Sequence, residues 1–229
     1  PRKSSTDLVN DMLLGLKLKC ALPPEQFLTF SGLLLGLAVT ATIPMLVPAL
    51  IHTRGLAEGS VGLFNALFAG GAVAGLFFLS PLINKRQHQR KKYLGCWSLL
   101  TFALCAATQA DEIWQLSTCL FFAGAASACI AMVGMDKRVM SIPFSVRVRL
   151  MASTLVISQL GSSVSFMMTG AIMSRSGATS LMWLYLGVFL IIVMYSMRSK
   201  KIWQFLEDDA ESELYYAKNH PKLAAIMSP

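Results

Sequence analysis

Charged residues are scarce in this sequence of 229 residues. Asp, Glu, Lys and Arg make up 14% of it and hydrophobic residues 55%, whereas an average soluble domain is about 25% charged. The charges gather in a few short clusters, and the long stretches between these clusters carry none. A soluble protein of this length could not bury so much apolar surface in one core, but a lipid bilayer can solvate it. The sequence therefore predicts an integral membrane protein.

Groups for catalysis or metal binding are also missing. The three histidines, His52, His88 and His220, lie in predicted loops or the tail, so no Ser–His pair can form within the membrane. The five cysteines form no CxxC pair and no Cys/His cluster, which predicts neither a structural disulfide nor a metal site. No glycine-rich phosphate loop precedes a helix. We expect no catalytic residue, no metal and no cofactor, which makes an intramembrane enzyme a poor interpretation.

Six apolar stretches have the length of membrane-spanning helices. Each has about 17 to 25 residues, enough to cross roughly 30 Å of hydrocarbon at 1.5 Å per residue. None contains Asp, Glu, Lys, Arg or His. Barrel strands would be shorter, with alternating polarity. The sequence predicts an all-α, polytopic membrane helix bundle with six transmembrane helices, over residues 27–51, 61–83, 93–109, 113–135, 150–173 and 180–197.

The basic residues predict how the bundle is oriented. Of the 20 Lys and Arg residues, 18 lie in the N-terminal segment, the second and fourth loops and the C-terminal tail. Only Arg54 and Arg175 lie in the other loops. Because basic loops stay in the cytoplasm, both termini are expected on the cytoplasmic side. The net charge of +8 does not indicate nucleic-acid binding, since the basic residues form no continuous patch with interleaved aromatics.

Small residues recur at spacings of four in several spans, which allows helix backbones to approach closely in lipid. Each of them could serve plain helix packing or a sliding, rocking interface. The sixth span is instead bulky and apolar all round, as expected for a helix that faces lipid. The candidates for helix packing are Gly32, Gly36, Gly71, Gly75, Gly124, Gly161 and Gly170.

A few polar side chains lie inside the spans. A buried amide or hydroxyl needs a partner, so these side chains are expected either to bond to a neighbouring helix or to line a wet cavity. Pro44 and Pro48 are expected to bend the first span near its outer end. The candidates for lining a substrate cavity are Thr40, Asn65, Gln159 and Ser162.

Several motifs resemble the second half of a major facilitator superfamily transporter, in the branch of bacterial drug, macrolide and siderophore exporters. Pro143, Arg147, Arg149 and Met151 match the family's P-x-x-x-R-G-R-x-M before the eleventh span, although Val148 replaces the glycine. The glycine-rich stretch 159–177 resembles the eleventh span itself, and the segment before residue 27 resembles the linker that precedes the seventh span.

The loop of residues 79–92 stands where the family has G-x-x-x-D-R-x-G-R-R. Asn84 replaces the acid and Ser80 the first glycine, while the basic cluster is kept. In the family this motif helps to latch the two halves together, and loss of the acid puts the latch in doubt. By resemblance, the candidates for cytoplasmic gating loops are Asn84, Lys85, Arg86, Arg147 and Arg149.

The resemblance implies that the chain is one half of a twelve-span transporter. Residues 1–26 would be the cytoplasmic linker between halves, 27–199 the six-span half and 200–229 a cytoplasmic tail. Spans one, two, four and five would line the cavity, and spans three and six would be peripheral. That division agrees with the small and polar residues of the spans.

By resemblance, the function would be proton-coupled efflux of an amphiphilic small molecule, a drug or a siderophore, across the cytoplasmic (inner) membrane of a bacterium. The partners would be the lipid bilayer, the missing N-terminal six-span half, the substrate and protons. Since no ionisable group lies in the predicted spans, the coupling carboxylate would lie outside this chain. The alternative is a non-transporting membrane subunit or scaffold derived from a truncated transporter.

Overall fold

The computed structural model describes residues 23–40, 42–55, 59–79, 88–133, 144–198 and 200–207. These residues form helices joined by short turns, with no strand among them, so the all-α prediction is confirmed. The elements are α2 (Pro23–Val39), α3 (Thr42–Thr53), α4 (Ser60–Ala74), the π-helical turn η1 (Gly75–Leu79), α6 (Gln89–Gln109), α7 (Ile113–Met132), α9 (Phe144–Ser176), the 3₁₀ turn η2 (Ala178–Ser180), α10 (Leu181–Arg198) and α11 (Lys200–Glu207).

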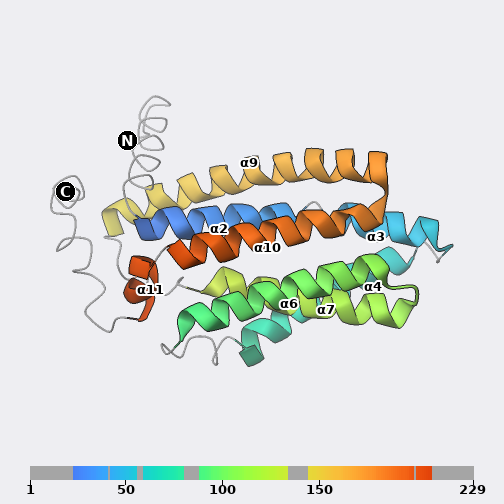
Figure 1. The fold of residues 1–229 in the computed structure, drawn as a ribbon, viewed down its shortest axis with the longest axis horizontal. Coiled ribbons are helices and arrows are strands. Elements are labelled where there is room, and N and C mark those ends of the chain that lie inside the picture. Colours follow the sequence, from blue (N-terminus) through green and yellow to red (C-terminus); the bar gives the residue numbers. More distant parts are fainter. Residues whose placement is uncertain are drawn as a thin grey trace, which may run out of the picture.

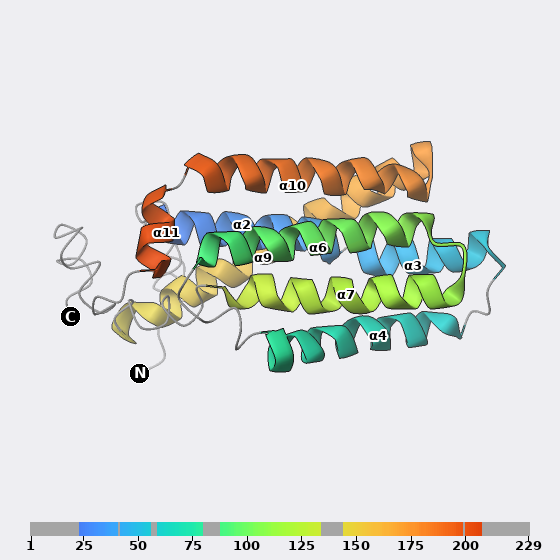
Figure 2. The same ribbon diagram turned by 60° about the horizontal axis from the view of Figure 1, so that its bottom comes forward.

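The long helices lie side by side along one axis, and α11 turns across one end of the bundle (Figure 1). Within the described residues, five segments are long and apolar enough to cross a membrane: Pro24–Thr53, Ser60–Leu79, Ile113–Met132, Ala152–Ser176 and Ala178–Arg198. The remaining long helix, α6, starts with a basic turn, but it runs alongside α7 over its whole length (Figure 2). A helix that lies along a spanning helix crosses the same bilayer, so α6 completes the bundle.

The first three spans and the last three spans contact one another in a repeated pattern. The first three spans are α2–α3, α4–η1 and α6, and the last three are α7, α9 and α10. α2 packs against α9, and α4 packs against α7, so that the first span of each group contacts the second span of the other. α6 fills the space between α7 and α10. The bundle thus has an internal two-fold pattern.

The first span is broken in its middle rather than bent near its outer end. α2 ends at Val39 and α3 begins at Thr42. Pro44 explains the break, because it has no backbone N–H to donate to the carbonyl of Thr40, four residues earlier, and its ring clashes with that carbonyl. Pro48 is accommodated inside α3. Pro44 therefore explains an interruption earlier in the span than expected, while Pro48 does not interrupt α3.

Two helices begin earlier than the predicted spans. α9 starts at Phe144, because no proline or glycine interrupts the sequence from there to Leu160. α2 starts at Pro23, which brings Glu25 into the first spanning helix, where its side chain is fully buried. The predicted span 27–51 holds no ionisable group, but the helix that contains its first part starts four residues earlier and includes Glu25.

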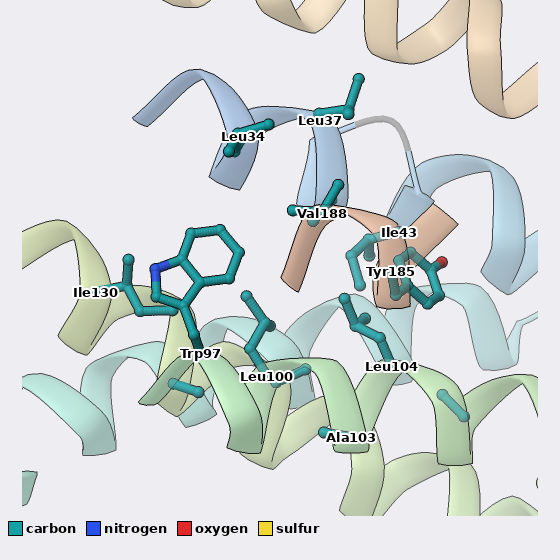
Figure 3. Packing of buried hydrophobic residues seen from close by; sticks show 14 of the residues in the cluster. Leu34, Leu37, Ile43, Trp97, Leu100, Ala103, Leu104, Ile130, Tyr185 and Val188 are labelled. Atoms are coloured by element: carbon teal, nitrogen blue, oxygen red, sulfur yellow. The ribbon is translucent and has the colours of Figure 1, made fainter. Parts of the chain in front are cut away.

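The interior of the bundle is built around α6. Trp97, Leu100 and Leu104 are each at most 1% exposed. They point toward Val188 and Tyr185 of α10 on the opposite side of the core (Figure 3). The third span is therefore peripheral to the cavity described below but central to the packing of the bundle.

The helix after the last span, α11, packs back onto the bundle. It contacts α2 and α6. Its Trp203 indole N–H donates to the carbonyl of Ser196 at 3.0 Å. The Oε1 atom of Glu207 accepts the backbone N–H of Gln89 at 3.1 Å, which satisfies one of the free donors at the start of α6. α11 thereby ties the end of α10 to the start of α6.

Candidate functional site

A cavity of about 340 Å³ lies between α2, α4, α7 and α9. The helices α6 and α10 contribute no lining residue. None of the described residues around it is charged, and its polar groups are hydroxyls. The lining residues are Gly32, Leu35, Gly36, Val39, Thr40, Phe68, Ala72, Ser127, Ala128, Ala131, Ser158 and Ser162.

Gly32 and Gly36 create space in the cavity instead of seating a neighbouring helix. A Cβ atom added at Gly32 would meet nothing within 4 Å, and one at Gly36 would meet only the Thr40 hydroxyl at 3.7 Å. Both glycines line the cavity. Gly32 and Gly36 were expected to let a neighbouring helix approach closely, but the volume beside them is open.

The wall formed by α4 and α7 is held by glycines in direct backbone contact. A Cβ at Gly71 would collide with the carbonyl of Phe121, and one at Gly124 would collide with the carbonyl of Phe68. One at Gly75 would lie 2.6 Å from the carbonyl oxygen of Ala125. Only glycine permits this approach. We call the contact of these three glycines with the facing helix the α4–α7 seam.

The opposite wall, formed by α2 and α9, is held by one hydrogen bond and by looser glycine contacts. The Ser165 hydroxyl of α9 donates to the Leu37 carbonyl of α2 at 2.8 Å. A Cβ at Gly161 would come within 3.2 Å of the Leu33 side chain of α2, and farther along α9 one at Gly170 would come within 3.4 Å of the Met45 methyl group of α3. These neighbours are flexible side chains, so this wall has more freedom to shift than the α4–α7 seam.

The structure brings two of the four predicted cavity residues together. Thr40, directly after α2, and Ser162 of α9 both line the cavity. Asn65 and Gln159 are exposed and do not line it. Asn65 lies three residues before Phe68, on the same side of α4.

Two further serines, Ser127 and Ser158, line the cavity and were not among the candidates. The Ser127 hydroxyl donates to the Gly124 carbonyl at 2.8 Å. The Ser158 carbonyl accepts the hydroxyl of Ser162 at 3.0 Å. Ser158 precedes Ser162 by one helical turn, and Ser165 and Thr169 continue the same face. This spacing of hydroxyls in α9 is a sequence signal that could have identified Ser158.

The gating-loop candidates fall in two groups, before α6 and at the start of α9. Asn84, Lys85 and Arg86 lie outside the described residues. Arg147 and Arg149 lie in the first turns of α9 and not in a loop, because that helix begins at Phe144. Their side chains lie outside the described part of the chain.

A charged contact closes the end of the bundle where α3 ends and α7 begins. The Arg54 guanidinium donates to the Thr108 carbonyl at 3.4 Å and lies 4.0 Å from the Asp111 carboxylate. Asp111 is 92% exposed and Arg54 only 18%, so the carbonyl contact matters more than the screened ion pair. The contact fixes the end of α3 to the α6–α7 turn.

The sequence profile of the Major Facilitator Superfamily matches residues 28–214. The chain belongs to the Major Facilitator Superfamily. It is therefore a multi-pass membrane protein of a transporter family, which acts in transmembrane transport. No curated protein and no solved structure matches the chain. In this superfamily each six-span half contains two inverted three-span repeats, and the pairing of α2 with α9 and of α4 with α7 follows that pattern.

Proposed function

We propose that this chain is the C-terminal six-span half of a twelve-span exporter, which moves an amphiphilic small molecule out of a bacterium in exchange for protons. The observation that carries the proposal is the cavity between α2, α4, α7 and α9. It is lined by aliphatic, aromatic and hydroxyl groups, with no charged residue among its described lining. Such a surface binds the apolar body of a ligand and a few of its hydrogen-bonding groups.

The exposed faces of α4 and α9 support the assignment as one half. Leu63 on α4 is 51% exposed, and Leu160 and Met167 on α9 are 64% and 76% exposed. These two helices flank the cavity. In the superfamily the halves face one another around a central site, so a second half placed against α4 and α9 would cover these side chains and close the cavity.

The charges support the proposed orientation and location. The end of α3, which Arg54 follows, and the end of α9, which contains Arg175, lie at one end of the bundle, and the start of α2 and the end of α10 lie at the other (Figure 1). In the sequence, the strongly basic segments precede the first span, join spans two and three and spans four and five, and follow the sixth span. All of these connections belong on the side of the membrane where the first span starts and the sixth span ends. Under the positive-inside rule, the second end faces the cytoplasm of the bacterial inner membrane, as do both termini.

We place the proton-coupling carboxylate in the N-terminal half. The described lining of the cavity contains no acid, and proton coupling needs an ionisable group that alternates between two environments. Glu25 is buried in α2 but does not line the cavity. We assign Glu25 a structural role at the start of that helix.

The test uses inverted vesicles that contain the twelve-span protein. With an acidic interior, they should accumulate an amphiphilic drug or siderophore, and a protonophore should abolish the accumulation. Glu25→Gln should keep the gradient dependence, and replacement of one acid in the N-terminal half should remove it. Accumulation that ignores the proton gradient, or that loses its gradient dependence in Glu25→Gln, would contradict the proposal. A protein that accumulates nothing would favour a non-transporting subunit.

A further inference from the structure

A second concave surface lies on the outside of the bundle, away from the four-helix cavity. It is a groove of about 860 Å³ between the start of α2 and the end of α10. Most of its wall is apolar, with Phe30 from α2 and Ile191, Met194 and Met197 from α10. Met194 and Met197 are 67% and 60% exposed. These side chains offer a long, flexible hydrocarbon surface that suits an acyl chain.

The polar end of the groove carries a positive charge. Arg198, the last residue of α10, is exposed and lines the groove. Among the described residues, Arg54 and Asp111 form an ion pair at the opposite end of the bundle. No described carboxylate forms one with Arg198. Lys200 and Lys201 follow it in the sequence. The groove is therefore apolar along its length and cationic where the span ends.

Stacked aromatic rings hold the wall of the groove in place. The Tyr195 ring stacks on Phe27 at a centroid distance of 5.4 Å and meets the edge of Phe30 at 5.2 Å. Phe27 also contacts Trp203 of α11 at 5.3 Å. Aromatic side chains are enriched at both membrane–water interfaces, and these rings lie beside Arg198, the last residue of α10. We therefore infer that this end of the groove lies near the lipid headgroups.

We propose that this groove binds an anionic phospholipid, with an acyl chain along Ile191, Met194 and Met197 and its phosphate at Arg198. Charge complementarity selects the occupant, because the groove joins a hydrocarbon surface to a cation at headgroup level. Basic pockets between transmembrane helices on the cytoplasmic side bind anionic headgroups in this way. The site is separate from the cavity of the proposed transport function and shares no lining residue with it.

Native mass spectrometry of the full chain, in detergent with equal amounts of phosphatidylglycerol and phosphatidylcholine of the same acyl chains, tests the proposal. The first lipid adduct should favour phosphatidylglycerol about fivefold, as expected for one basic residue near an anionic headgroup. Arg198→Gln should bring the ratio close to one, and Arg198→Lys should keep most of the preference. The matched control is Arg175→Gln, an exposed arginine at the far end of α9, which should leave the ratio unchanged.

A second variant tests the groove itself. Met194→Trp fills the apolar wall and should lower the adducts of both lipids alike. A phosphatidylglycerol preference that survives Arg198→Gln, or that falls equally in Arg175→Gln, would show that the phosphate does not bind at Arg198. Unchanged adducts in Met194→Trp would show that the acyl chain lies elsewhere.

Discussion

At the scale of single residues, two serines determine part of what the cavity offers a substrate. The hydroxyl protons of Ser127 and Ser162 are donated to carbonyls of their own helices, at 2.8 and 3.0 Å. Their oxygen lone pairs remain for a ligand. These two positions therefore present acceptors, and they favour a substrate that carries a donor beside its apolar body.

Ser162→Ala should raise the KM for transport about two- to tenfold with little change in kcat, since a net hydrogen bond contributes about 0.5–1.5 kcal/mol. Initial rates in the inverted vesicles, measured over a range of substrate concentrations, give both constants. Ser163→Ala is the matched control, because Ser163 makes the same kind of bond to the carbonyl four residues earlier but is not in the cavity lining. Equal effects of the two substitutions would remove Ser162 from the site.

Sequence reasoning named four polar candidates, of which Thr40 and Ser162 lie in the lining of the cavity. Nearness to a glycine does not separate them from the other two, since Gln159, like Ser162, lies within two residues of Gly161. Asn65 and Gln159 were chosen because a buried amide is costly, but both side chains are exposed in this bundle. Which side of a helix faces a neighbour depends on the packing of all the helices, and one sequence does not specify it.

At the scale of elements, the α4–α7 seam is the most tightly constrained contact around the cavity. Gly71 and Gly124 each place their Cα against a backbone carbonyl of the facing helix. The seam positions Phe68 and Ala72 on one side of the cavity wall and Ser127 and Ala128 on the other. Its rigidity contrasts with the side-chain contacts between α2 and α9.

Gly71→Ala should destabilise the bundle by about 1–3 kcal/mol, because the added methyl group meets backbone that cannot move aside. The midpoint of thermal unfolding in detergent should fall by several degrees. The adjacent Gly70→Ala is a matched control: its Cβ would meet nothing within 4 Å, and alanine is the better helix former. A midpoint that falls as far for Gly70→Ala as for Gly71→Ala would contradict this account of the seam.

The sequence predicted the elements better than their ends and interruptions. Runs of apolar residues located the six spans, because hydrocarbon thickness sets their length. The break after Val39 follows from Pro44 and could have been placed from the missing N–H. The π-helical turn Gly75–Leu79 had no such local signal. Its first residue, Gly75, contacts the backbone of Ala125 on α7.

At the scale of the whole molecule, the bundle separates its packing core from its cavity. α6 and α10 provide buried side chains such as Trp97 and Tyr185 but no cavity residue. The large apolar side chains that stay exposed on α4 and α9 lie on the two helices beside the cavity. This separation supports our proposal that a second half completes the cavity. The family resemblance implied this division of roles, and the small and polar residues of the spans agree with it.

The central claim is that the cavity between α2, α4, α7 and α9 is the substrate path, and filling it is the most direct test. Gly36→Leu places a side chain in the cavity. Gly187→Leu adds the same group on α10, outside the cavity, where a Cβ meets nothing within 4 Å. In inverted vesicles with equal amounts of folded protein, Gly36→Leu should reduce gradient-driven accumulation at least tenfold and Gly187→Leu should leave it near the wild-type rate. Undiminished accumulation in Gly36→Leu would contradict the account.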